Sequence, residues 1–202
     1  MVDGIELRTA ADKGEGVFAT RSFRLGETVM VGRIDGEVDH NHPHASQVSE
    51  QRFVLHGGLI PKVNHSCEPN CGVRVNSGGA HDILARQPIA ADEEITFDYA
   101  MRNYVVEYFP AECRCGSRRC RGRISGWRDL SAQRKADYHG YVARYLIDID
   151  NRRATVRISP GLVVHRACPD RSGMNIQPPT RAISHHQVSR NRVLAHRAPR
   201  RW

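Results

Sequence analysis

Residues 64–71 read Asn64-His65-Ser66-Cys67-Glu68-Pro69-Asn70-Cys71. Because Pro69 cannot continue an α-helix, this stretch is predicted to be extended or looped. The side chains of Asn64, His65 and Ser66 present hydrogen-bond donors and acceptors in a row, a set suited to a purine and an amino-acid group. Residues 64–71 are therefore a candidate binding loop.

A second motif lies further along the chain, at Cys113-Arg114-Cys115-Gly116-Ser117-Arg118-Arg119-Cys120. Three thiols this close together, in a segment too polar to build its own core, suit a tetrahedral zinc site, with unligated thiols as the alternative. Zinc takes four ligands and this run supplies three, so Cys67 or Cys71 has to close the site. The requirement links the cysteine run in space to the candidate binding loop.

Two further motifs lie on either side of the binding loop in the sequence. Lys13-Gly14-Glu15-Gly16 places two glycines one residue apart before a predicted strand. Such glycines let the backbone approach a ligand closely, although an ordinary turn is the alternative. Residues 93–99 are predicted to form an inward-facing strand that ends at the phenol of Tyr99. Taken alone, Tyr99 is either a core tyrosine or a catalytic one.

Short apolar or alternating runs recur between residues 4 and 149, separated by turn-forming residues. Short strands at irregular spacing predict a mainly β domain with several small sheets. One short C-terminal helix is predicted near residues 131–146, with Ser131 as its N-cap. The residues of its packing face are Tyr138, Val142, Tyr145 and Leu146.

The basic excess of the chain lies at its C-terminal end. The 202 residues carry a net charge of +8, yet residues 1–150 hold 19 Lys and Arg against 21 Asp and Glu. Residues 151–202 hold 11 Arg and the single acid Asp170, and are predicted to be a disordered basic tail. This tail is either an arm that touches a polyanion or a functionally silent extension. Nucleic-acid contact is expected only weakly, through the tail.

No run approaches the roughly 18 consecutive apolar residues that span a bilayer, so no membrane partner is expected. The N-terminus is charged and interrupted by Gly4, which does not resemble a signal peptide. The expected compartment is the cytoplasm, where thiols stay reduced. The six cysteines are therefore interpreted as possible metal ligands before disulfides.

Taken in order, Gly14-x-Gly16, residues 64–70, Phe97-Asp98-Tyr99 and the cysteine run followed by Arg121-Gly122 resemble a SET domain with its post-SET segment. The resemblance implies a β-clip of several small sheets in which the chain forms a pseudoknot. That fold would bring Asn64 and Tyr99 together. The implied boundaries are 5–104 for the SET domain, 109–127 for the post-SET zinc segment, 128–150 for a helix packed on the core and 151–202 for the disordered tail.

The resemblance implies an enzyme that transfers methyl from S-adenosylmethionine to a lysine of a protein or peptide. Tyr99 would be the catalytic residue, Phe97 would line the lysine channel, and Trp127 would lie near the cofactor. The cofactor-binding residues would be Lys13, Gly14, Glu15, Gly16, Asn64, His65 and Tyr99. A structural Zn²⁺ would be held by Cys67, Cys113, Cys115 and Cys120.

Two positions depart from the pattern of the family. It usually has Arg-Phe-Ile where this chain has Pro61-Lys62-Val63, and a tyrosine where Ile34 stands. These departures leave open a catalytically inactive SET-fold module, clipped by zinc, that binds proteins. A zinc-dependent nucleic-acid binder would need aromatic residues among the basic ones, and only Trp127 lies near Arg118–Arg123.

Overall fold

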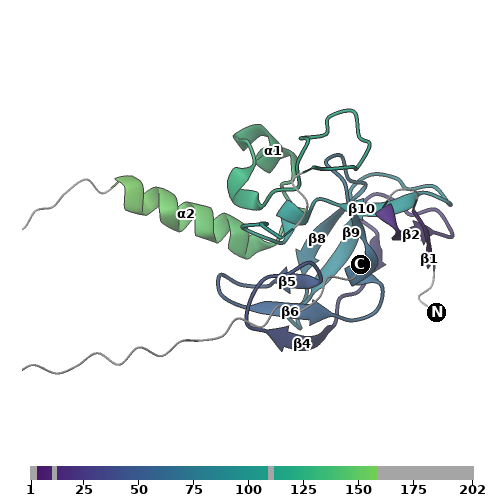
Figure 1. Ribbon diagram of the computed structural model, residues 1–202, viewed down its shortest axis with the longest axis horizontal. Helices are drawn as coiled ribbons and strands as arrows, with labels where there is room; N and C mark the ends of the chain where they lie inside the picture. The colour runs from purple at the N-terminus through teal and green to yellow at the C-terminus, as the bar shows by residue number, and fades with distance from the viewer. Residues whose placement is uncertain (1–3, 11–12, 109–111, 159–202) are drawn as a thin grey trace, which may run out of the picture. The chain divides into compact units, whose positions relative to one another are not determined.

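A computed structural model describes residues 4–10, 13–108 and 112–158 of the protein. The chain forms short strands, with two helices near the end of the described part (Figure 1). The strands are β1 (Ile5–Thr9), β2 (Glu15–Ala19), β3 (Thr28–Met30), β4 (Ile34–Val38), β5 (Ala45–Gln47), β6 (Phe53–His56), β7 (Asn64–His65), β8 (Cys71–Val75), β9 (His81–Ala85) and β10 (Glu94–Phe97). The helices are α1 (Ala132–Asp137) and α2 (Arg144–Ile158), and the 3-10 turns are η2 (Ile60–Lys62), η3 (Tyr99–Met101) and η4 (Trp127–Asp129). None of the helices in these described ranges could serve as a membrane span.

The strands pair into three small sheets, which confirms the predicted mainly β fold. Their orders are β1-β2-β10-β7, β3-β9-β8 and β4-β6-β5. Fully buried apolar side chains, among them Val17, Ile83 and Ile95, belong to one hydrophobic core. No strand exceeds five residues, so burial in this shared core, rather than strand length, stabilises the sheets.

The first sheet joins segments that are far apart in the sequence. Strand β10 pairs antiparallel with β2, where Ile95 faces Val17. The same strand pairs in parallel with β7, where Thr96 faces Asn64 and Phe97 faces His65. Three of the sequence motifs, those around Gly16, Asn64 and Tyr99, therefore meet at the ends of neighbouring strands.

The helical region differs from the single helix predicted at residues 131–146. Ser131 is the N-cap, as predicted, and its hydroxyl accepts a hydrogen bond from the amide of Arg134 at 3.2 Å. However, α1 ends at Asp137, and Gly140 follows with φ of 82°, a conformation that ends a helix. A second helix, α2, then begins at Arg144. The prediction missed this break because Gly140 lies inside an otherwise periodic stretch.

The predicted start of the tail at residue 151 is also too early. The helix α2 continues to Ile158, with Leu146 and Ile149 buried in the core and residues 151–155 exposed. Because no proline lies between Arg144 and Pro160, nothing in the covalent chain stops the anchored helix at residue 151. The rest of the predicted tail, residues 159–202, lies outside the described residues.

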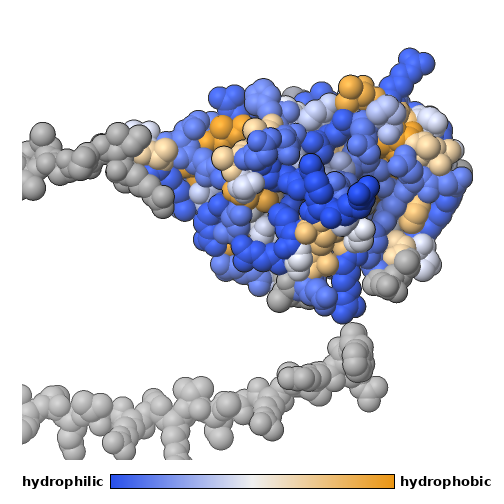
Figure 2. Space-filling model, turned by 90° about the horizontal axis from the view of Figure 1, so that it is seen from above, coloured by the Kyte–Doolittle hydropathy of each residue, from blue (hydrophilic) through white to orange (hydrophobic). Residues whose placement is uncertain are grey.

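Large apolar side chains are scarce on the surface of the described part. The exposed ones there are Leu7, Leu25 and Val31. Figure 2 shows a face on which hydrophilic residues predominate and hydrophobic residues gather only in small groups. The described surface therefore gives no sign of an extended apolar docking face.

Two stacked histidines lie buried between β6 and β9. The ring centroids of His56 and His81 are 5.0 Å apart with the rings nearly parallel, and the ring centroid of Tyr145 lies 6.3 Å from that of His81. His56 Nε2 accepts the amide N–H of His81 at 3.0 Å, and its Nδ1 lies 3.0 Å from the hydroxyl of Ser46. Neither ring nitrogen of His81 has a hydrogen-bond partner in the described part of the chain.

These histidines should make the protein sensitive to mild acid. Burial, followed by the charge of Arg102, lowers the pKa of His56 to about 4, while Asp35 opposes the shift. Burial, followed by His56 and Arg102, also lowers the pKa of His81. Below about pH 6.5 these histidines bind protons in the unfolded chain but stay neutral in the folded one. Their contribution to the unfolding free energy is therefore complete above that pH and falls as the pH drops toward 4. We expect a loss of about 2 kcal/mol per histidine between pH 7 and pH 5, measured by urea unfolding.

A matched pair of variants isolates the contribution of the buried ring. His81→Phe keeps a stacked ring without a titrating group, so its unfolding free energy should fall less between pH 7 and pH 5. His44→Gln changes an exposed histidine and should keep the full pH dependence. An equally steep loss in His81→Phe and in the unmodified protein would show that the acid sensitivity arises elsewhere.

Candidate active site and metal centre

Asn64 holds the glycine loop that precedes β2. Its side-chain nitrogen donates to the carbonyl of Glu15 at 3.0 Å and to the carboxylate of Glu94 at 2.8 Å. A Cβ at Gly16 would lie 2.9 Å from that nitrogen and 2.8 Å from the Glu94 oxygen, so only glycine fits this position. Gly14 has φ of 77°, which favours glycine as well.

Lys13 completes this corner through an ion pair with Glu94. The predicted cofactor-binding residues Lys13, Gly14, Glu15, Gly16 and Asn64 are thus neighbours in space, around the carboxylate of Glu94. Sequence analysis did not single out Glu94. Its position at the start of β10, opposite Phe18 of β2, could be read only from the register of the sheet.

Tyr99 lies at the end of β10, where η3 begins. Its hydroxyl donates to the carbonyl of Val63 at 3.2 Å, next to Asn64 in the sequence, and its side chain is largely buried. Its ring centroid is 5.2 Å from that of His65. Burial raises the pKa of Tyr99, so the phenol stays protonated at neutral pH and acts as a hydrogen-bond donor.

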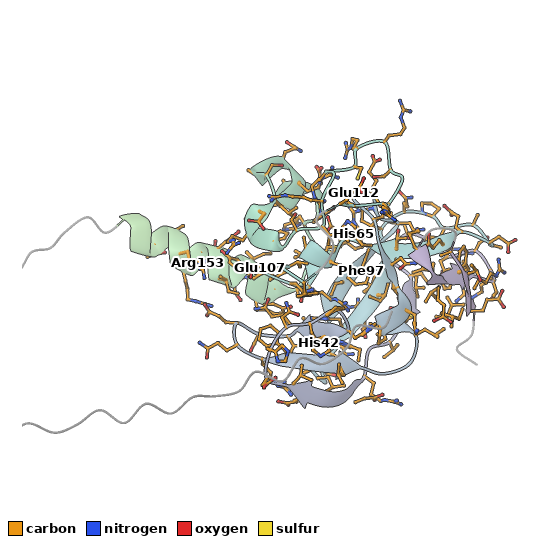
Figure 3. All side chains as sticks on the ribbon, in the orientation of Figure 1. His42, His65, Phe97, Glu107, Glu112 and Arg153 are labelled. Atoms are coloured by element: carbon orange, nitrogen blue, oxygen red, sulfur yellow. The ribbon has the colours of Figure 1, made fainter. Side chains whose placement is uncertain are left out.

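The ring of His65 is directed away from the glycine loop. Its Nδ1 accepts the amide N–H of Tyr99 at 3.3 Å, and its Nε2 lies 3.4 Å from the sulfur of Cys67. Burial lowers the pKa of His65 to about 4, so the ring is neutral. Because both ring nitrogens are occupied, a cofactor contact from His65 would come from its backbone. Figure 3 shows His65 and Phe97 as close neighbours, in agreement with their pairing in the sheet.

An arginine that sequence analysis did not select covers Phe97. The guanidinium of Arg102 lies 4.8 Å from the ring centroid of Phe97 and 5.5 Å from that of Tyr99. Arg102 is 4% exposed, and its Nε has no hydrogen-bond partner within the described residues. Burial lowers its pKa, although it remains a cation. Phe97 is fully buried beneath it, and its place along a lysine channel stays a prediction.

Trp127 belongs to the core rather than to a ligand site. Only 3% of its surface is exposed, and its Nε1 donates to Asp150 at 2.9 Å. Asp150 also accepts from Tyr104 at 3.0 Å and from Lys135 at 2.6 Å. The expectation that Trp127 lies against a cofactor is therefore replaced by a role in attaching α2.

Four cysteines form a compact cluster, with their sulfur atoms all within 4.8 Å of one another: Cys67, Cys113, Cys115 and Cys120. The sulfurs of Cys67 and Cys113 are 3.9 Å apart, close to the roughly 3.8 Å that Zn–S bonds of 2.3 Å give in a tetrahedron. Cys71 lies in β8 opposite Ala85 and is outside the cluster. The choice between Cys67 and Cys71 is thus settled in favour of Cys67, and the donor set fits a structural Zn²⁺.

Backbone and side-chain donors surround these sulfurs. The amide of Arg121 donates to Cys67 and the amide of Gly122 donates to Cys120, each at 3.4 Å. Burial opposes ionisation of Cys115, but hydrogen bonds from Ser117 and from backbone amides bring its pKa down to about 6. N–H groups directed at sulfur stabilise thiolates, which are the form that binds zinc.

Asp98 connects the cysteine segment to the turn that carries Tyr99. This fully buried carboxylate accepts two hydrogen bonds from the guanidinium of Arg121, at 2.5 and 3.0 Å. It also accepts the hydroxyl of Tyr138 at 2.8 Å and the amide of Ala100 at 3.1 Å. One side chain therefore binds together η3, the cysteine segment and the end of α1.

Replacing Asp98 should be strongly destabilising. In Asp98→Ala the guanidinium of Arg121 and the hydroxyl of Tyr138 would stay largely buried without their acceptor. Removing one partner of a buried pair costs about 3–5 kcal/mol, which urea unfolding measures. Glu37→Ala is the control, because its ion pair with Arg52 is exposed and should contribute less than about 1 kcal/mol. Equal losses in the two variants would contradict the role given to Asp98.

Comparisons with known proteins agree on one family. The SET domain family model matches residues 14–100. Histone-lysine N-methyltransferase ash1 of Drosophila melanogaster is 33% identical over 145 residues, which cover 61% of this chain and 6% of the relative. Human histone-lysine N-methyltransferase SETD1A is 39% identical over 72 residues, covering 34% of this chain and 4% of the relative. This chain therefore spans only a small part of the length of these curated relatives.

Among solved structures, KRYPTONITE in complex with mCHG DNA and SAH is similar, with a TM-score of 0.47 and 26% identity. The match covers 59% of this chain and 28% of that one. The family match extends from the glycine loop to the turn of Tyr99, the two ends of the site described above. Residues 14–100 of this chain are therefore similar to the SET domain family.

Proposed function

We propose that the protein is a protein-lysine methyltransferase that uses S-adenosylmethionine. The observation that carries the proposal is that Asn64, which holds the glycine loop, directly follows Val63, whose carbonyl accepts the hydroxyl of the protonated Tyr99. The relatives named above are histone-lysine N-methyltransferases, which supports the same reaction. SAH, named with the similar KRYPTONITE structure, is the product form of this cofactor.

The residues of this chain would have separate roles in cofactor binding and methyl transfer. Lys13, Gly14, Glu15 and Gly16 with Asn64 would bind the cofactor, largely through the loop backbone, and His65 would contribute its main chain. When bound, S-adenosylmethionine supplies an electrophilic methyl group on a sulfonium. Tyr99 would orient the incoming amine with its hydroxyl, without acting as a base.

The substrate lysine has to reach the site as a neutral amine. A free lysine has a pKa near 10.4, so presenting it uncharged at pH 7 costs about 4–5 kcal/mol. An apolar, water-poor site lowers that pKa by desolvating the ammonium. Positioning of the amine lowers the reaction barrier further, because a nucleophile bound in the correct geometry reacts as if it were highly concentrated.

A structural Zn²⁺ would be held by the four clustered cysteines. All four coordination positions would be filled by thiolates, which leaves none for a water nucleophile. The metal would therefore order the segment that follows η3 rather than take part in the transfer. Reduced thiols are required for this, and we accordingly propose a cytoplasmic location.

One observation favours the second candidate, an inactive SET-fold module that binds proteins. The guanidinium of Arg102 lies over the ring of Phe97, the residue proposed to line a lysine channel. If Arg102 keeps this position when a peptide binds, the fold and the metal cluster remain but turnover is absent.

A transfer assay separates the two candidates. The full-length, zinc-loaded protein is incubated with methyl-labelled S-adenosylmethionine and, in parallel, with a histone H3 peptide and with a mixture of basic proteins. Label in lysine side chains, located by mass spectrometry, is the expected result. Cofactor binding by calorimetry without any label transfer would favour the inactive module, and absence of both would contradict the proposed function.

A further inference from the structure

The ring of His65 lies between the metal cluster and the backbone of Tyr99. Its Nδ1 faces the Tyr99 amide at 3.3 Å and its Nε2 faces the Cys67 sulfur at 3.4 Å. The His65 side chain is 4% exposed, so water does not compete for either nitrogen. We propose that His65 is a positioning residue that connects the zinc-bound thiolate of Cys67 to the catalytic turn at Tyr99. The link to catalysis rests on the proposed function; the link to the metal does not.

The donor and the acceptor of each hydrogen bond follow from the chemistry of the three groups. A backbone amide can only donate, so Nδ1 of His65 must accept from Tyr99 and carries no proton there. A neutral imidazole has one proton, which is then on Nε2 and is directed at Cys67. A metal-bound thiolate is an acceptor, so this N–H completes the bond.

Asp98, the other polar group near Nδ1 of His65, already has hydrogen-bond donors of its own. Asp98 Oδ1 lies 3.5 Å from Nδ1, which is long for a hydrogen bond. The carboxylate of Asp98 is occupied by Arg121 and Tyr138 instead. Asp98 therefore does not require a proton on Nδ1 of His65.

The arrangement is rigid on every side of the ring. Tyr99 packs against His65 with ring centroids 5.2 Å apart, and His65 itself is paired with Phe97 in the sheet. A ring fixed in this way transmits a shift of the Cys67 thiolate to the Tyr99 amide. Zinc binding and the position of the catalytic turn would thus be linked, and linkage acts in both directions.

The first test measures zinc affinity in full-length protein by competition with a chromogenic chelator. Outer hydrogen bonds to metal ligands typically contribute 10–100-fold to affinity, so His65→Ala should raise the zinc Kd by that factor. In His65→Gln the amide oxygen can accept from Tyr99 and the amide nitrogen can donate to Cys67, so most of the affinity should return. His139→Ala, an exposed histidine, is the matched control and should bind zinc as the unmodified protein does.

The second test needs no substitution and stands even if His65→Ala fails to fold. Amide hydrogen exchange is followed by NMR with zinc bound and after its removal. The Tyr99 amide should exchange at least several-fold faster without zinc, while the Ala85 amide, bonded to Glu27 at 2.9 Å in another sheet, should change little.

These outcomes decide the proposal without any methyl transfer. A His65→Ala protein that binds zinc as tightly as the unmodified chain would overturn the link to the metal. Unchanged protection of the Tyr99 amide on zinc removal would overturn the link to the catalytic turn. Failure of the transfer assay alone would remove the proposed function and leave the metal link standing.

Discussion

Tyr99→Phe should lower the turnover number by about two to three orders of magnitude, the range seen when one preorganised hydroxyl or amide donor is removed from an active site. The ring would keep its packing against His65 and Phe97, whose centroids lie 5.2 and 5.3 Å away. The hydroxyl and its bond to the Val63 carbonyl would be lost. Cofactor affinity and unfolding free energy should therefore change little, while kcat with saturating peptide falls.

Tyr104→Phe is the matched control for this experiment. Tyr104 is also a buried tyrosine close in sequence to Tyr99. Its hydroxyl, however, donates to Asp150 at 3.0 Å, away from the glycine loop and Asn64. We expect a small loss of stability and normal turnover. Near-normal turnover in Tyr99→Phe would remove the phenol from the mechanism, and an equal fall in both variants would indicate a structural effect.

Removal of zinc should abolish activity and release the cysteine segment. That segment has few apolar residues of its own, so its order depends on the metal, whereas the sheets are held by the hydrophobic core. We expect a chelator to eliminate turnover, to lower the melting temperature, and to do both reversibly when zinc is restored. Elemental analysis of the purified protein should give one zinc per chain.

Two cysteine variants sharpen the metal experiment. Cys120→Ser removes one predicted ligand and should lose bound zinc and activity together. Cys71→Ala changes a buried cysteine outside the cluster and should keep one zinc per chain, with only a modest packing loss. Active protein without zinc, or a zinc lost in Cys71→Ala but kept in Cys120→Ser, would contradict the assignment of ligands.

Much of the candidate site could be predicted from local sequence chemistry. The Cys-x-Cys-x4-Cys run requires a fourth ligand from elsewhere, and the structure places Cys67 beside it. The Gly14-x-Gly16 spacing indicates a close approach of the backbone to a ligand, which stays a prediction; the structure adds the side chain of Asn64 against the carbonyl of Glu15. The inference about the cysteines agrees with the structure because it rests on a coordination number, a requirement of the metal site itself.

Other features depend on tertiary contacts that no spacing reveals. The sequence predicts a cofactor contact for His65 but does not reveal that its ring lies between Tyr99 and Cys67. Arg102 carries no motif, and its position over Phe97 follows from the fold of η3. Gly140 breaks a pattern that is otherwise helical. In each case the decisive partner is distant in sequence or lies in a turn whose conformation the pattern does not specify.

The placement of β10 between β2 and β7 has a consequence for how the chain folds during synthesis. The central strand of the first sheet is the last of its four strands to leave the ribosome. Until Phe97 has emerged, β2 lacks its inner neighbour and β7 has no partner in that sheet. Pairings between residues so far apart close long loops, which slows folding and prolongs the exposure of unpaired edges. Nascent chains that stop before residue 97 should therefore depend on chaperones.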